Sequence, residues 1–134
     1  MKNKSLLDSF AILAWMQNEK GALTVETLLA EARRRGEKLL LHEINLAEIY
    51  YLTIRRAGEE RAKAIAEQLL TLPLEVVSTT DEILWRAARL KARYPLSLAD
   101  AFAAATALAR GAQVVTGDPE FKGISHLVEI LWLG

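Results

Sequence analysis

The chain contains no cysteine, which excludes disulfide bonds and metal sites built from thiolates. It contains two histidines, His42 and His126, which are too few for a zinc site that depends on histidine ligands. We expect both to have structural roles. A bound metal would therefore be a hard ion held by oxygen atoms, such as magnesium or manganese.

The formal net charge is zero, because 17 basic residues balance 17 acidic residues. Bulk attraction to nucleic acid is then weak, so any binding of nucleic acid requires a local basic patch. Basic residues do cluster, and the favoured interpretation is solvated helix faces with intrahelical partners, the alternative being phosphate contacts. The clusters are Arg33, Arg34, Arg35 and Lys38; Arg55 and Arg56; and Arg86, Arg89 and Arg93.

Long hydrophobic runs are also missing, and none approaches the roughly 20 residues that cross a bilayer. The N-terminal LLDSFAILAWM is interrupted by Asp8 and lacks a small-residue cleavage site, so it does not resemble a signal peptide. The length of 134 residues fits one core better than two, and 51% hydrophobic with 25% charged residues is typical of a soluble globular domain. We predict a single domain over residues 1–134, in the cytoplasm and without membrane contact.

Short apolar segments alternate with longer segments of helical periodicity. Strands separated by helical crossovers predict an α/β domain in which a mainly parallel sheet of four to five strands carries helices on both faces. The predicted strands are residues 4–7, 38–42, 74–78, 112–116 and 127–133. The predicted helices are residues 9–16, 22–35, 44–56, 59–72, 81–94 and 97–110, and Trp15 and Trp85 are expected to pack in the core.

Four acidic residues stand where apolar segments meet helices: Asp8, Glu48, Asp100 and Asp118. A carboxylate in apolar surroundings is costly unless a cation, a donor or a proton compensates it. Asp8 and Asp118 follow the strands at 4–7 and 112–116, where parallel sheets bind ligands. The helices of Glu48 and Asp100 must pass near that edge. These positions favour one shared cation.

Each acid also has a simpler interpretation. Asp8 is a good helix N-cap, Asp118 precedes a proline as N-caps often do, and Asp100 stands three residues after Ser97 in a capping-box arrangement. Capping does not account for Glu48, which shares a helix face with mostly apolar residues. Its neighbours three and four positions away are Ile44, Asn45, Tyr51 and Leu52.

The segments LLDSFAILAW, LAEIYY, SLADAFAAATA and VVTGDPEF, in this order, resemble the PIN domain family and particularly its VapC-type toxins. The resemblance covers essentially the whole chain and implies a PIN-like three-layer α/β/α sandwich. It also implies catalytic and metal-binding roles for the four acids, with Mg²⁺ or Mn²⁺ as the cofactor. The hydroxyl residues of the family match Ser9 and Thr116, which would orient carboxylates or bound water.

The function implied by this resemblance is a metal-dependent endoribonuclease, the toxin of a type II (VapBC) toxin–antitoxin system. A metal-activated water would hydrolyse the RNA phosphodiester and leave a 5′-phosphate and a 3′-hydroxyl. The implied partners are RNA, a cognate antitoxin and a second copy of the chain, with Tyr50, Tyr51, Ile54 and the helix after Gly58 as an apolar dimer face. The chain departs from the family pattern at Glu120, where many relatives have aspartate, and at the bulky Phe10.

Three alternatives remain open. The first alternative is a PIN nuclease outside toxin–antitoxin systems, acting in RNA processing or on DNA. A receiver-like phosphoacceptor module also gathers aspartates at a sheet edge, but it needs a lysine after a late strand, and VVTGD supplies none. A non-catalytic PIN interaction module is disfavoured because all four acids are present.

Overall fold

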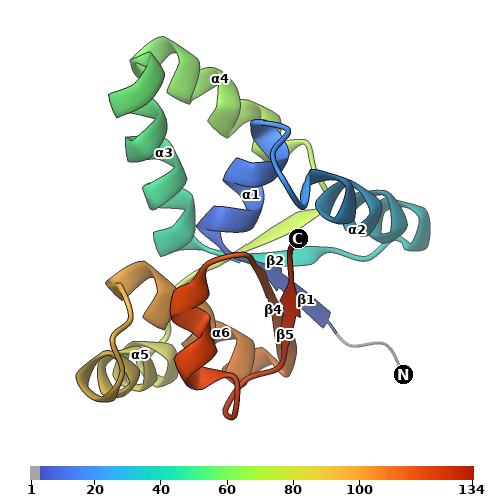
Figure 1. Ribbon diagram of the computed structural model, residues 1–134. Helices are drawn as coiled ribbons and strands as arrows, with labels where there is room; N and C mark the ends of the chain where they lie inside the picture. The colour runs from blue at the N-terminus through green and yellow to red at the C-terminus, as the bar shows by residue number, and fades with distance from the viewer. Residues whose placement is uncertain (1–3) are drawn as a thin grey trace.

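The structure is a computed structural model that describes residues 4–134, in which a five-stranded parallel sheet lies between two layers of helices (Figure 1). The strand order is β3-β2-β1-β4-β5, and every adjacent pair is parallel. The strands are β1 (Lys4–Leu7), β2 (Leu39–His42), β3 (Leu74–Val77), β4 (Ala112–Thr116) and β5 (Ile130–Trp132). The α/β class and the parallel sheet predicted from the sequence are confirmed.

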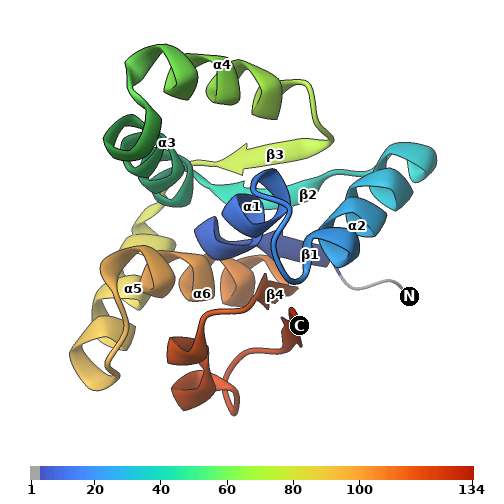
Figure 2. The ribbon, with the colours of Figure 1, turned by 45° about the horizontal axis from the view of Figure 1, so that its top comes forward.

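Six α-helices and one 3₁₀-helix connect these strands within residues 4–134. They are α1 (Ser9–Met16), α2 (Ala22–Arg35), α3 (Glu43–Ala57), α4 (Glu59–Leu70), α5 (Asp81–Arg93), α6 (Leu98–Arg110) and the 3₁₀-helix η1 (Pro119–Ile124). Figure 2 shows α1, α2 and α4 on one side of the sheet and α5 and α6 on the other. Helix α3 contacts α1, α4 and α6, so it stands at the end of the sheet where both layers meet.

The strands separate two hydrophobic cores by the alternation of their side chains. Leu6 and Val114 face the core that contains α5 and α6, whereas Leu7 and Val115 face the core that contains α1 and α2. The central strands β1, β2 and β4 are largely buried on both faces, which explains continuous apolar segments such as the three leucines of β2. Helix α6 is buried along most of its length, and its alanines bring its backbone close to the sheet.

The chain leaves β1 toward β2 on one side, and β4 lies against β1 on the other, so the strand order reverses at β1. Ligands of parallel sheets bind at such a reversal, beyond the carboxyl ends of the strands. Asp8 directly follows β1, and Asp118 lies two residues beyond β4. The topology therefore brings two of the predicted acids to one edge.

The C-terminal segment differs from the prediction of a strand over residues 127–133. Strand β5 is confined to Ile130–Trp132, because the N–H groups of Leu127 and Val128 both donate to the carbonyl of Ile124 and close a turn. The 3₁₀-helix before this turn was not predicted. No helix within residues 4–134 is both long and apolar enough to cross a membrane.

Candidate metal centre at the carboxyl edge of the sheet

Asp8 joins β1 to α1 and is the N-cap of that helix, so the capping interpretation is confirmed. Its Oδ1 accepts a hydrogen bond from the N–H of Ala11 at 2.8 Å, and its Oδ2 accepts one from the hydroxyl of Thr116. The residue is nevertheless 0% exposed. Burial raises its pKa to about 7 against the opposing effect of the two hydrogen bonds, and the charges of Asp118 and Glu48 raise it further.

Thr116 ends β4 and connects two of the acids. Its hydroxyl donates to the carboxylate of Asp8 and accepts a hydrogen bond from the N–H of Asp118 at 3.0 Å. The residue is fully buried, so its rotamer is fixed by packing as well as by these bonds. Thr116 therefore holds the Asp8 carboxylate and the start of the next loop in a fixed relation.

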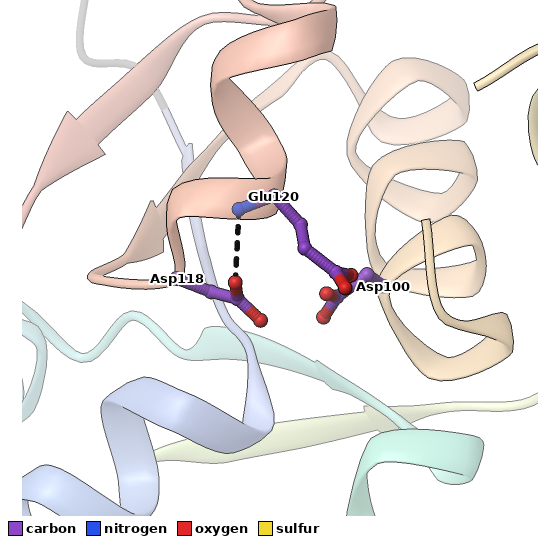
Figure 3. Close-up of side chains that lie close together, drawn as sticks. All are labelled: Asp100, Asp118 and Glu120. Carbon is purple, nitrogen blue, oxygen red and sulfur yellow. Dashed lines mark hydrogen bonds between the residues drawn. The ribbon is translucent and has the colours of Figure 1, made fainter. Parts of the chain in front are cut away.

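The carboxylates of Asp100, Asp118 and Glu120 point toward one another from α6 and η1, as Figure 3 shows, and we call them the acidic triad. Each contributes an oxygen to a group in which all such atoms lie within 4.8 Å of one another. Asp118 caps η1 through a hydrogen bond from the N–H of Glu120 to Oδ1 at 2.9 Å. Asp8 and Glu48 are outside this group.

Asp100 lies in the first turn of α6, where its N–H donates to the hydroxyl of Ser97, the N-cap, at 3.1 Å. The side chain is buried, and Oδ2 has no hydrogen-bond partner. Burial raises the pKa of Asp100 to about 9, and hydrogen bonds with Asp118 and Glu120 raise it too, since a protonated Asp100 can donate to either carboxylate. Without a cation, Asp100 thus keeps its proton at neutral pH.

Glu120 belongs to the site although the sequence left a metal-binding role at this position in doubt. Its Oε1 accepts a hydrogen bond from the backbone N–H of Ser97 at 3.0 Å. Ser97 therefore caps α6 with its hydroxyl and holds Glu120 with its main chain. The departure from aspartate to glutamate lengthens the side chain by one methylene, and the longer side chain still reaches the acidic triad.

Glu48 approaches the same site from α3. It is half-buried, its Oε2 accepts a long hydrogen bond of 3.5 Å from the hydroxyl of Tyr51, and its charge raises the pKa of Asp8. The helix face around it is less apolar than expected. Tyr51 is 43% exposed, whereas Asn45 is fully buried.

Asn45 is a residue that the sequence reasoning named only as a neighbour of Glu48. Its Nδ2 donates to the hydroxyl of Ser9 at 3.1 Å and to the carbonyl of Ala99 at 3.3 Å. The hydroxyl of Ser9 donates in return to the backbone carbonyl of Asn45 at 3.3 Å. Asn45 thereby joins α1, α3 and α6, the helices that position Asp8, Glu48 and Asp100. The signal in the sequence that could have revealed this role was a polar amide one helical turn before Glu48.

Ser9 is buried and contacts Asn45 rather than the Asp8 carboxylate. His42 is the N-cap of α3, where Nδ1 accepts from the N–H of Ile44 at 3.1 Å and the ring stacks on Phe102. Burial lowers the pKa of His42, in keeping with its expected structural role. The expected core position of Trp85 is wrong, because this side chain is 60% exposed.

The donor set fits a hard divalent cation. The charges that raise the pKa values of Asp8 and Asp100 are those of other carboxylates, and the Glu82–Arg86 and Glu75–Arg110 ion pairs include none of the site acids. Asp100 Oδ2 is a buried acceptor without a donor. Carboxylate oxygens are the ligands that magnesium and manganese prefer.

A parallel α/β/α sandwich that gathers carboxylates from several elements at the carboxyl edge of its sheet is an architecture suited to holding a divalent cation. The chain belongs to the PIN domain family, whose sequence profile matches residues 5–127. The family resemblance drawn from the four sequence segments is thereby confirmed. A search of curated proteins found no match.

Solved structures of the same fold come from toxin–antitoxin systems. The chain is similar to the DNA-bound VapBC of Salmonella typhimurium, with a TM-score of 0.74 and 22% identity over 97% of this chain and 98% of that chain. It is similar to VapC20 of Mycobacterium tuberculosis, a toxin that cleaves the sarcin–ricin loop, with a TM-score of 0.71 and 21% identity over 90% and 95%. For VapBC-1 of nontypeable Haemophilus influenzae the TM-score is 0.71, with 20% identity over 96% of both chains. These TM-scores show that the chain shares the PIN-like sandwich.

Proposed function

We propose that this PIN domain is a Mg²⁺- or Mn²⁺-dependent endoribonuclease and the toxin of a type II toxin–antitoxin system. The observation that carries the proposal is the buried, uncompensated acidic site, in which Asp100 Oδ2 lacks any partner. Membership of the PIN domain family and similarity to VapBC structures, one of them an RNA-cleaving toxin, support the choice of reaction and system.

Asp8, Glu48, Asp100 and Asp118 would hold the metal, with Glu120 as a further oxygen donor from the acidic triad. When bound, a divalent ion acidifies a water molecule and neutralises charge on the phosphoryl oxygens. Metal binding would release the proton that Asp100 holds when burial and the neighbouring carboxylates raise its pKa.

The remaining residues fix the acids before any ligand arrives. Two hydrogen bonds hold Asp8, one from the N-terminus of α1 and one from Thr116. Ser97 holds Glu120, and the N–H of Glu120 holds Asp118. The amino ends of α1 and α6 lie at the site and favour negative charge through their dipoles. This chain therefore positions the carboxylates and excludes water from Asp8.

Cleavage of single-stranded RNA with magnesium, with manganese and with EDTA tests the reaction. Changes to residues that only orient the ligands of a metal cost about 10- to 100-fold, so Asp100→Asn, which alters a proposed metal ligand, should lose more than about 100-fold in rate. The matched control is Glu75→Gln, the same change of charge at the opposite end of the sheet, which should cleave like the wild type. Cleavage that survives chelation, or full activity in folded Asp100→Asn protein, contradicts the proposal.

The assignment as a toxin requires separate tests. Expression in a bacterial cytoplasm should arrest growth, and co-expression of the adjacent small open reading frame should relieve the arrest. Cleavage of RNA without growth arrest would favour a PIN nuclease of RNA processing. The proposed homodimer through Tyr50, Tyr51 and Ile54 should appear in sedimentation, whereas a monomer at all concentrations contradicts it.

A further inference from the structure

Phe10 is an exposed aromatic side chain at the edge of the acidic site. It lies in the first turn of α1, immediately after the buried residues Asp8 and Ser9, and yet it is 42% exposed. The other two phenylalanines, Phe102 and Phe121, are 6% and 0% exposed. An apolar ring in this position needs an explanation other than core packing, because one side of it remains in water.

The covered side of the ring lies on Gly117. A Cβ atom at position 117 would stand 2.9 Å from Cζ and 3.1 Å from Cδ1 of Phe10, closer than side chains normally approach. Gly117 is not among the residues with positive φ, so its backbone conformation does not require glycine. Glycine is required instead because the ring of Phe10 occupies the space that a Cβ atom at position 117 would need.

This contact places the ring at the loop that carries the acids. Gly117 lies between Thr116, which donates to Asp8, and Asp118 of the acidic triad. An RNA phosphate bound at these carboxylates would bring the base of an adjoining nucleotide to the open face of the ring. Aromatic side chains beside a phosphate site stack on bases with little regard to base identity, because every base has a π-face.

We propose that Phe10 is a substrate-positioning residue that stacks on the base next to the scissile phosphate. This inference rests on the proposed ribonuclease activity and adds a contact to the same site. The stacking supplies binding energy and orientation without selecting a sequence. It also explains the pairing of a bulky residue at position 10 with glycine at position 117.

The test compares Phe10→Ala and Phe10→Leu with the wild type. Leucine keeps an apolar contact with Gly117 but has no aromatic face, so it separates stacking from packing. The matched control is Leu23→Ala, which removes a side chain that is 79% exposed on α2. Thermal unfolding of all four proteins shows whether they fold alike.

Kinetics are measured on a short single-stranded RNA whose cleavage position has been mapped, and on the same RNA with an abasic nucleotide on either side of that position. Loss of one base–aromatic stack corresponds to a rise in KM of about 5- to 150-fold for Phe10→Ala and Phe10→Leu, with kcat retained. One of the two abasic substrates should remove this difference from the wild type. Phe10→Trp should retain the wild-type KM.

Two results would overturn the inference while leaving the ribonuclease in place. The first is a KM for Phe10→Ala equal to that of Leu23→Ala. The second is a penalty of the same size on both abasic substrates, which would mean a structural role. Absence of cleavage by the wild-type protein with either metal instead overturns the proposed function, and this inference with it.

Discussion

At the amino end of the sheet, Glu75 of β3 accepts two hydrogen bonds from the guanidinium group of Arg110, at 2.9 and 3.1 Å. At the carboxyl end, the charged neighbours of Asp8 and Asp100 are other carboxylates. The pKa of Glu75 accordingly falls below its usual value through the hydrogen bonds from Arg110, whereas burial raises that of Asp8 to about 7. The two ends of one sheet thus carry carboxylates that are paired with a cationic side chain and carboxylates that are not.

The two ends of the sheet differ in whether their carboxyl groups find partners within the chain. The pair at the amino end is half-exposed and satisfied within the chain, so it needs nothing further. The carboxyl end has the opposite properties, since its acids are buried, oppose one another and include an oxygen without a partner. Strongly perturbed carboxyl groups gathered at the edge where parallel sheets bind ligands are typical of functional sites. Under the proposed function, a bound cation would offset this cost.

The largest expected effect is on the pH dependence of stability in the metal-free protein. Asp8 has a pKa of about 7 in the folded protein against an ordinary value of 3.8, so its contribution to stability is lost as pH rises from about 4 to 7. About three pKa units at roughly 1.4 kcal/mol each amount to about 4 kcal/mol. In EDTA, the stability of Asp8→Asn relative to the wild type should therefore increase by about this amount between pH 4 and 7.5.

Urea denaturation at each pH measures this difference. Taking the difference between variant and wild type removes the opposing contribution of His42, whose lowered pKa costs stability as pH falls below 6.5 in both proteins. Glu75→Gln is the control with the opposite sign, because a carboxyl with a lowered pKa loses stability as pH falls. A flat difference for Asp8→Asn would mean that Asp8 is solvated and that the two ends of the sheet do not differ.

The next largest effect is stabilisation by metal. A divalent ion at 100 times its dissociation constant should raise the unfolding free energy by about 2.7 kcal/mol. The shift in melting temperature should be large at pH 8 and small at pH 5, because protons on Asp8 and Asp100 compete with the ion. Asp100→Asn should lose the shift, and Glu75→Gln should keep it. An equal shift in Asp100→Asn would place the ion elsewhere.

A smaller effect is expected at Asn45, which joins the three helices around the acids. Asn45→Ala removes the amide that donates to the carbonyl of Ala99 and to the hydroxyl of Ser9, at a cost of about 1–3 kcal/mol in unfolding free energy, although the Ser9 hydroxyl still donates to the backbone carbonyl of residue 45. Cleavage and metal affinity should fall as well, because α3 loses its side-chain hydrogen bonds to both α1 and α6. Thr53→Val is the control, since it removes a buried polar group of α3 away from the site. Equal activity of the two variants would show that Asn45 only stabilises the fold.

The fold and the positions of Asp8 and Asp118 were predictable because they depend on the order of strands and helices along the chain. Apolar runs such as that of β4 and the helical periodicity between them define a parallel sheet, and that topology alone places Asp8 and Asp118 at one edge. The exposed position of Trp85 could also have been predicted from the sequence. Buried residues of α5 follow helical spacing at Ile83, Ala87 and Leu90, which leaves Trp85 on the opposite face.

The rest of the site depends on contacts between distant residues. Glu120 joins the acidic triad because the N–H of Ser97 holds it, a bond across 23 positions in the sequence. Asn45 is important only because α1 and α6 approach α3, and no local pattern encodes that approach. The start of the strand predicted over 127–133 was wrong for a different, local reason, because Leu127 and Val128 belong to a turn closed by the carbonyl of Ile124.

The smallest effect is expected at the amino end, where Glu75→Gln removes the charge but keeps the shape of the side chain. Exposed ion pairs contribute less than about 1 kcal/mol, and the side chains of Arg110 and Glu75 are 30% and 44% exposed. The variant should therefore lose little stability at pH 7, and less still in high salt, where screening weakens the pair. Chemical denaturation at two salt concentrations measures this loss, and RNA cleavage should be unchanged.

A strong fall in cleavage would mean that α6, which carries Arg110 at one end and Asp100 at the other, transmits the loss of the pair to the acidic site. The two ends would then be coupled through one helix, and the contrast between them would no longer separate structure from function.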